Sequence, residues 1–536
     1  MAVEKKMEPS DIEVEGGENI EIEVVNPEAV SVETEDGGML IDFSGEIANE
    51  ILGPSHDANL AEFLDEADLQ SMASELVGDF DGDRMSRKEW ARSYVKGLDL
   101  LGMKIEERSQ PWAGASGVFH PVLTEAVVRF QAQAMGELFP ASGPVRTKVV
   151  GKQTIEKLQQ AKRVENEMNY LLTEEMTEYR DELEQMLFML PLAGSAFKKS
   201  YYDPIRKRPA SMFVPAEDFV VSYGASDLAT CPRYTHVMKK TSNEVAELIF
   251  NGFYRETELP DPEPDYSDIQ EKYDELDGEE AVIEDDDRHT LLEIHTDMIM
   301  PPPFNEPNGL ACPYVITIDK SSRTILSIRK NWYENDPDKQ KRLHFTHYRY
   351  LPGLGFYGTG LIHLIGGLAK SATSILRQLI DAGTLSNLPA GLKARGLRIK
   401  GDDSPLMPGE FRDVDVPGGA IKDSITFIPY KEPSGVLYQL LGNIVEEGRR
   451  IGSVADVQVG DLNNQAPVGT TLALMERSMK VMSGVQARLH SSLKAELRLI
   501  AKIISDFMGP KYAYETEQEA NRTEDFDGRV DVIPVS

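Results

Sequence analysis

The stretch from Gly355 to Gly509 restricts the possible folds of this chain most, because a helical period is interrupted in it and then resumes. Apolar residues recur at three- and four-residue spacing after Gly360, which predicts a first long helix over 356–387. Prolines and glycines crowd 388–433, with strand-like runs at Leu397–Lys400 and Ile425–Ile428. We therefore expect a long helix that leads into a compact β-rich excursion.

The helical period returns after this excursion and predicts two more helices, over 434–456 and 471–509, with a polar loop over 457–470 between them. The apolar stripes of such helices need packing partners. In the first two helices the candidate packing residues are Leu368, Ile375, Leu376, Leu379, Leu440, Leu441 and Ile444. A ring of identical subunits would supply the partners, since heterologous interfaces that close generate cyclic symmetry.

The net charge of −34 is concentrated in two segments. Residues 1–70 hold 20 acidic and 2 basic residues, and residues 256–287 hold 16 acidic residues and 1 basic residue, so the remaining chain is nearly neutral. A chain of this kind does not grip nucleic acid, because phosphate binding needs Lys and Arg. It is compatible with DNA that passes by. We expect a partly disordered arm over 1–70, with short strands as the alternative, and a surface loop or linker over 256–287.

The region 71–355 shows helices followed by strands, so we expect an α+β fold that is mainly helical. The predicted helices are Ser86–Gly102, one that begins at Pro121, and two within Lys152–Leu190 that are broken near Thr173. A β-meander is predicted over His289–Met300, Tyr314–Asp319 and Thr324–Lys330. The last segment, 510–536, is short and strand-like at Val530–Val535.

Two groups of residues suggest a metal site and then fail its requirements. Asp79–Asp83 begins like a calcium loop, but Arg84 and Trp90 stand where such a loop needs Gly and Glu, so we expect an acidic turn that caps a helix with Glu89 in a capping box. His344 and His347 lie in an aromatic run that predicts a strand, which sends them to opposite faces. We expect no metal and no cofactor.

The glycine-rich segments also lack the residues that nucleotide binding needs. The turn over 111–117 does not end in Lys-Ser/Thr, the run over 351–360 has no GxGxxG, and no Walker A motif occurs. No nucleophile–base pair is evident, so we do not expect an enzyme. The two cysteines, Cys231 and Cys312, favour a reducing compartment, and neither a signal peptide nor a membrane span is expected.

The order helix, β excursion, helix, loop, helix, together with the passage over 108–140, resembles the portal protein of tailed, short-tailed bacteriophages, the head–tail connector. The resemblance implies a wing over 71–355 and stem helices over 356–387 and 434–456. It further implies a clip over 388–433, a tunnel loop over 457–470, a long wing or tunnel helix over 471–509 and a crown remnant or base over 510–536.

The resemblance also implies roles for individual residues. The DNA-facing residues of the tunnel loop would be Asp461, Asn463, Asn464 and Gln465, although the residues alone fit an ordinary interhelical loop equally well. The clip residues that dock the terminase or the adaptor would be Lys393, Arg395, Arg398, Lys400 and Arg412. The packing residues of the two stem helices would contact neighbouring subunits.

The implied partners are those of a portal vertex. They are other copies of the chain in a dodecameric ring, the terminase large subunit, the head–tail adaptor and tail proteins, and the major capsid or scaffold protein. Double-stranded DNA would pass through without sequence-specific binding, and no membrane is involved. The protein would be made in the host cytoplasm and reside in the virion. The alternatives are another head or tail structural protein, such as a scaffold or tail component, and, less well supported, a packaging enzyme.

Overall fold

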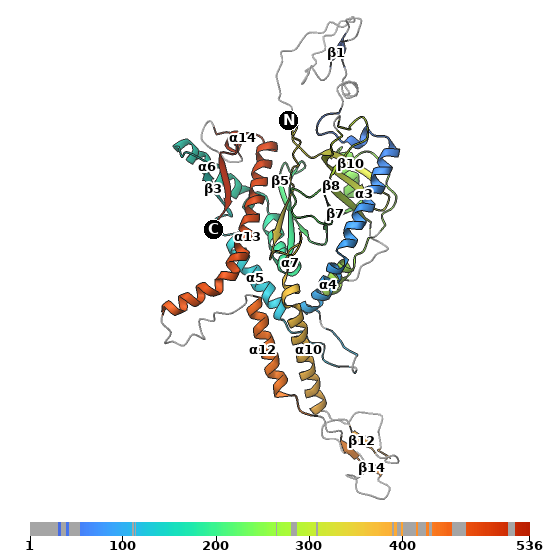
Figure 1. The fold of residues 1–536 in the computed structure, drawn as a ribbon, viewed down its shortest axis with the longest axis vertical. Helices are drawn as coiled ribbons and strands as arrows, with labels where there is room; N and C mark the ends of the chain where they lie inside the picture. Colours follow the sequence, from blue (N-terminus) through green and yellow to red (C-terminus); the bar gives the residue numbers. More distant parts are fainter. Residues whose placement is uncertain are drawn as a thin grey trace.

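The computed structural model describes most of the chain after residue 53 and places a stalk below a mixed α+β body (Figure 1). The described residues are 54–104, 106–109, 112, 114–263, 265–279, 287–306, 309–387, 431–452, 484–512 and 520–535, with the backbone of 468–483 and of six short strands. Helices hold about 47% and strands about 19% of the residues. The predicted α+β class with mainly helical content is confirmed.

The body contains a five-stranded antiparallel sheet in the order β10-β9-β8-β7-β6. Its strands are β6 (Phe219–Val221), β7 (Arg233–Thr241), β8 (Arg288–Met298), β9 (Cys312–Asp319) and β10 (Thr324–Lys330). The predicted meander is thereby confirmed. Helix α3 (Glu66–Ser86) packs its apolar side chains on one face, and α8 (Ser242–Phe250) lies near the other.

A three-stranded sheet, in the order β11-β4-β5, forms a second layer. Its strands are β4 (Ser195–Asp203), β5 (Arg208–Pro215) and β11 (Phe345–Arg349). Aromatic side chains, among them Phe197 and Phe219, stack between the two sheets with ring centroids 4.0 Å apart. The main core lies where helices cover this sheet, and that core positions the long helix α13 (Val468–Phe507).

The helices α5 (Val122–Leu138), α6 (Ile155–Tyr170) and α7 (Glu178–Ala193) surround this core. A π-helical turn, Leu171–Glu175, separates α6 from α7, as the predicted break near Thr173 required. The C-terminal strand β16 (Val530–Pro534) pairs with β3 (Val145–Val149) and follows the one-turn helix α14 (Arg522–Asp525). The C-terminal strand is therefore confirmed, and it is built into the body.

Two expectations for the N-terminal half are wrong. Asp79–Asp83 lies inside α3 instead of forming a turn, because Arg233 on β7 neutralises both ends of the run. In the next helix, α4 (Lys88–Leu98), Arg87 occupies the N-cap position without a side-chain capping hydrogen bond, and the expected capping box with Glu89 does not form because Ser86 still belongs to α3. A short 3-10 turn, Asp99–Leu101, follows α4.

The two acidic segments contain more structure than their composition predicted. Helix α9 (Asp268–Asp277) occupies the middle of 256–287, where a loop or linker was expected. In the arm, β1 (Ser31–Glu33) pairs with β2 (Met39–Ile41), and the 3-10 turn Leu60–Glu62 lies at the edge of β10 with Leu60 and Ala61 buried. The predicted disorder of 1–53 otherwise lies outside the described residues.

The stalk consists of α10 (Leu361–Asn387) and α12 (Gly435–Ile451), which lie side by side and project from the body (Figure 1). Its tip carries two antiparallel strand pairs, β12 (Gly391–Lys393) with β15 (Ile425–Phe427) and β13 (Arg398–Ile399) with β14 (Val414–Asp415). The predicted helix–β excursion–helix order is confirmed. Helix α13 begins three residues before the predicted limit of the polar loop.

Candidate functional site

The apolar stripes of the two stalk helices pack against each other within one chain. Ala372, Ile375 and Leu441 are buried at this contact, and the half-buried members that surround them are Leu376, Leu379, Leu437, Ile444 and Val445. The structure thus brings together five of the seven predicted packing residues. It does not bring in Leu368, which is half-buried higher on α10, or Leu440, which is exposed. For all seven residues, contact with a neighbouring subunit stays a prediction.

Helix α12 still carries large apolar groups outside the stripe that packs on α10. The exposed fraction is 75% for Val436 and 74% for Tyr438, and Leu440 is exposed as well. On α10, Leu364 and Ile380 are also exposed. Scattered exposed apolar residues are ordinary, but a two-helix stalk that presents several of them has apolar surface available for another helix.

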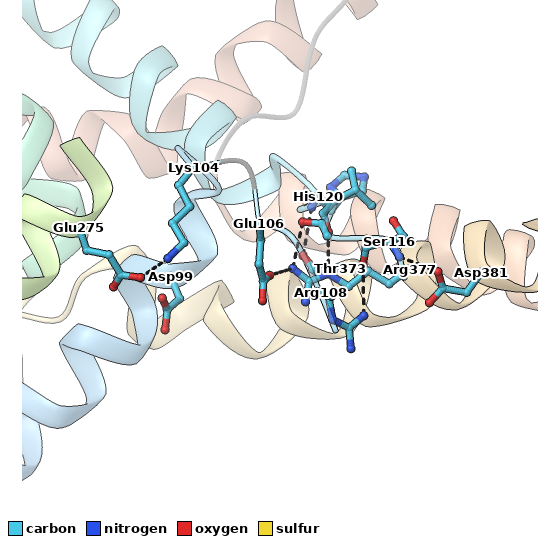
Figure 2. A network of polar contacts seen from close by, with 12 residues as sticks. Asp99, Lys104, Glu106, Arg108, Ser116, His120, Glu275, Thr373, Arg377 and Asp381 are labelled. Atoms are coloured by element: carbon cyan, nitrogen blue, oxygen red, sulfur yellow. Dashed lines mark hydrogen bonds and ion pairs between the residues drawn. The ribbon is translucent and has the colours of Figure 1, made fainter. Parts of the chain in front are cut away.

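A loop between α4 and α5 lies along the middle of α10, and Arg377 holds it there (Figure 2). The Arg377 guanidinium donates to the Glu106 carboxylate at 2.6 Å and to the carbonyl oxygens of Val118 at 2.8 Å and Gly117 at 3.2 Å. It also lies over the Phe119 ring, 4.4 Å from the centroid. One side chain therefore binds the loop by charge, by backbone hydrogen bonds and by ring stacking.

Two further residues of α10 complete this attachment on the same face of the helix. The Thr373 hydroxyl accepts a hydrogen bond from the backbone N–H of His120 at 3.1 Å, and the Asp381 carboxylate accepts one from the N–H of Ser116 at 2.7 Å. Because Thr373, Arg377 and Asp381 are four residues apart, they lie in one row along α10. The loop thus follows α10 for about two helical turns.

The sequence of the loop is suited to this close course. At Gly117 an added Cβ would lie 1.7 Å from the carbonyl oxygen of Glu106, so the backbone there requires glycine. The glycine-rich turn of 111–117, as far as the structure describes it, is therefore a structural feature of the stalk base. The prediction that Pro121 introduces a helix is confirmed, since it is the N-cap of α5.

The first part of the same loop is attached to α9. Lys104 forms an ion pair with Glu275 (Figure 2). Lys272, which is buried, forms ion pairs with Asp99 and Glu275. The acidic segment is thus connected through the loop to α10.

The base of α12 rests on α5. Arg449 donates to the Glu125 carboxylate at 3.1 Å, and Gly448 lets Val122 approach closely, with 3.1 Å to the position of an added Cβ. Burial lowers the pKa of His120 in this corner, and the Arg449 charge lowers that pKa further, whereas Glu125 opposes both. Both stalk helices are therefore fastened to the body at their upper ends.

The glycines that precede α10 serve a close crossing of two backbone segments. Gly194, with φ of +85°, and Gly360 approach so closely that an added Cβ on Gly194 would lie 2.5 Å from the Gly360 nitrogen. The Gly358 N–H donates to Ser195 Oγ at 2.7 Å, and that hydroxyl lies 3.0 Å from His347 Nε2. The glycine-rich run of 351–360 thus has a structural reason.

Most of the predicted tunnel-loop and clip residues lie outside the part of the chain that the structure describes. Asp461, Asn463, Asn464 and Gln465 lie outside the described residues, as do Arg395, Lys400 and Arg412. Lys393 lies on β12 and Arg398 on β13, where only the backbone is described. Their roles stay predictions.

The two histidines of the rejected metal pair have separate partners. His347 lies on β11, as predicted, and His344 Nε2 lies 2.9 Å from Asn331 Oδ1 just before that strand. Within the described part of the chain, no group of three or more His, Cys, Asp or Glu residues is placed to hold a metal ion. No helix among the searched residues combines the length and apolar character of a membrane span.

The loop attachment was missed at the level of sequence, although one signal was available. Helix α10 carries few charges, and Arg377 and Asp381 are four residues apart among them. Residues four apart lie on one face of a helix, so these two charges could have indicated a polar partner along that face. A scan against protein-family models and a search of curated proteins found no match to the chain.

Proposed function

We propose that this chain is the subunit of a phage portal, a ring at one capsid vertex through which DNA is packaged and later ejected. The carrying observation is the stalk itself: two helices joined by a small β tip, followed by one 40-residue helix that returns into the body (Figure 1). Helix α10 has 27 residues, which at 1.5 Å per residue gives roughly 40 Å, a length suited to a channel wall.

In this proposal α10 and α12 form the stem, the β tip forms the clip that docks the terminase and later the tail adaptor, and the body forms the wing. The loop held by Arg377 braces the stem against the wing. The exposed apolar groups of α12 would then pack against the next subunit, as a closed ring requires. The chain itself performs no catalysis, and the work on DNA is left to a separate motor.

The charge distribution supports a conduit rather than a DNA-binding protein. The chain outside the two acidic segments is nearly neutral, so a channel built from it would hold a polyanion weakly. Weak holding is what a passage for DNA needs.

The test is the mass and symmetry of the purified full-length chain, by mass photometry and negative-stain class averages. We expect rings with a central hole, and a dodecamer of 59.7-kDa subunits would weigh roughly 716 kDa. The major groove of a DNA duplex alone is about 12 Å wide, and the whole duplex is wider. The hole should therefore be wider than about 20 Å, so that the duplex can pass. A compact dimer without a hole would contradict the proposal.

A further inference from the structure

One charged residue is completely buried in the stripe by which α13 packs on the body. The exposed fraction of Glu496 is 0%, and its neighbours along the stripe are apolar. They are Val485, Leu489, Leu493, Leu497, Ile500 and Ile504. Among the described side chains of α13, Glu496 is the buried charge. Burying a charged group is costly unless it is well bonded, so its place in the core calls for a reason.

The apolar part of the stripe defines the position of α13 along its axis poorly. Leu489, Leu493 and Leu497 are identical residues at four-residue spacing, so a shift by about one turn puts leucine where leucine was. The surface contacts repeat in the same way, because Lys494 and Arg498, also four apart, both bind Asp531. Such a stripe gives adhesion without a unique register.

Other polar contacts of α13 discriminate less well between registers. Arg488 donates to the carbonyl oxygen of Tyr350 at 3.0 Å, and Ser492 donates to that of His347 at 2.9 Å. Every residue of a strand carries such a carbonyl. Near the end of the helix, Tyr333 donates to Asp506 at 3.1 Å, in a half-buried position that water can reach.

The bonds of Glu496, by contrast, come from side chains at fixed positions. Ser211 Oγ on β5 donates to Oε1 at 2.7 Å, and the hydroxyl of Tyr348 on β11 donates to Oε2. Lys198 on β4 has an exposed fraction of 0%, with Nζ 3.4 Å from the Ser211 carbonyl oxygen and 4.4 Å from the centroid of the Tyr179 ring. The carboxyl group thus meets donors from two of the three strands of its sheet, with a buried cation on the third.

The electrostatics agree with this arrangement. Burial lowers the pKa of Lys198, whereas the nearby Glu496, Glu182 and Glu178 carboxylates act in the opposite direction. Burial and the adjacent Glu496 raise the pKa of Tyr348 well above its usual value, so its hydroxyl stays a donor.

We propose that Glu496, received by Ser211 and Tyr348 and faced by Lys198, fixes the register of α13 against the β11-β4-β5 sheet. A shift of one turn would carry the carboxyl group away from both donors into an apolar contact, which costs far more than the leucine exchange gains. A single buried polar residue that specifies register at some cost in stability is an established device in helix packing.

The consequence reaches the start of the helix. Because α13 is continuous from Val468 to Phe507, a register shift at Glu496 moves its first residue by the same axial distance, about 5 Å for one turn. The register lock itself does not depend on the proposed function. Its use, to hold the segment before α13 at one height in a channel, does rest on that function.

The test is a distance measurement by pulsed electron paramagnetic resonance on the isolated full-length chain. Spin labels are placed at Ser491→Cys, on the exposed face of α13, and at Ile205→Cys, in the exposed β4–β5 turn. The buried Cys231 and Cys312 are replaced by alanine. In this background and in Glu496→Gln, whose amide oxygen can accept from one hydroxyl while its NH2 group donates to the other, we expect one distance. In Glu496→Leu we expect a second population, displaced by up to about 5 Å.

Leu493→Ala is the matched control, because it weakens the same stripe and leaves the carboxyl group in place. It should lower the melting temperature and keep one distance. Since Glu496→Leu leaves Lys198 unpaired, the double variant Glu496→Leu/Lys198→Met guards against loss of folding, and the same second population is expected there. One unchanged distance in a folded leucine variant would overturn the register lock. That result would not bear on whether the chain forms a ring. Conversely, absence of a ring would not bear on the register lock.

Discussion

At the scale of single residues, Arg377 makes several of the contacts that hold the loop on α10. Its side chain is 17% exposed. In place of water, its guanidinium group contacts one carboxylate, two carbonyl oxygens and one aromatic ring. Hydrogen bonds that involve a charged group contribute about 1.5–3 kcal/mol each when one partner is removed. The arrangement is planar and forked, so a lysine cannot reproduce it.

We expect Arg377→Ala to lower the free energy of unfolding by about 2–3 kcal/mol, and Arg377→Lys to lose most of the same amount. Urea unfolding measures this, and tryptic cleavage after Lys104 or Arg108 should become faster because the loop detaches from α10. The control is Arg450→Ala on α12, whose side chain is 72% exposed and pairs only locally with Glu447. Its effect should stay within about 0.5 kcal/mol. Equal effects of the two alanine variants would argue against the attachment.

His236 gives the folded chain a pH dependence with a defined sign. It is buried between the sheets, and burial, aided by the Lys199 charge, lowers its pKa to about 3. The unfolded chain binds this proton near the ordinary value of 6.5, so between these values the unfolded state holds more protons. The contribution of neutral His236 is present above pH 6.5 and is lost as the pH falls toward 3.

The variant His236→Gln lacks this titration, so its stability should approach that of the wild type as the pH falls. We expect the difference in unfolding free energy to shrink by at most about 1.4 kcal/mol per pH unit below pH 6.5. Urea unfolding of both chains at pH 7.5, 6.5 and 5.5 measures it. A constant difference across that range would show that His236 is not held neutral.

At the scale of elements, local patterns predicted what local physics decides. The meander, the break between α6 and α7, and the stalk helices follow from residue period and from turn residues that lie within each segment. Helix α9 was missed because acidity dominates its composition, although Ile269 and Lys272 are buried and Tyr273 bonds to Tyr94 at 3.0 Å. A turn was wrongly expected at Asp79–Asp83 because the partner of Asp79 and Asp83 is Arg233, far along the chain.

The candidate site likewise has one part that the sequence predicts and one part that it does not. The facing stripes of α10 and α12 could be predicted from sequence, because each stripe is visible in its own helix. The attachment of the loop to Arg377 could not, since the bonded residues are about 260 positions apart. The pairing of β16 with β3 and the buried partners of Glu496 are equally non-local. Sequence period reveals that a face needs a partner, whereas the identity of that partner depends on the tertiary fold.

At the scale of the whole molecule, the stalk is the part whose shape makes least sense for an isolated chain. Two helices that project from a body bury one side of each, and α12 keeps Val436 and Tyr438 more than 70% exposed. Every additional subunit beside the stalk would cover such groups. The proposed ring therefore predicts that these side chains stabilise the assembly and leave the fold of one subunit nearly unaffected.

We expect Val436→Ser/Tyr438→Ser to change the unfolding free energy of the subunit by no more than about 0.5 kcal/mol, because both positions are exposed. The ring should dissociate at higher protein concentration than the wild-type ring, since burial of each large apolar side chain contributes about 1.5–3 kcal/mol per interface. Mass photometry over a dilution series measures this dissociation. The matched control is Phe250→Ser, which removes a side chain that is 91% exposed at the end of α8 in the body, away from the stalk. Rings sensitive to Phe250→Ser and not to the α12 variant would place the subunit contact elsewhere than on α12, and rings sensitive to neither would argue against a stalk contact between subunits.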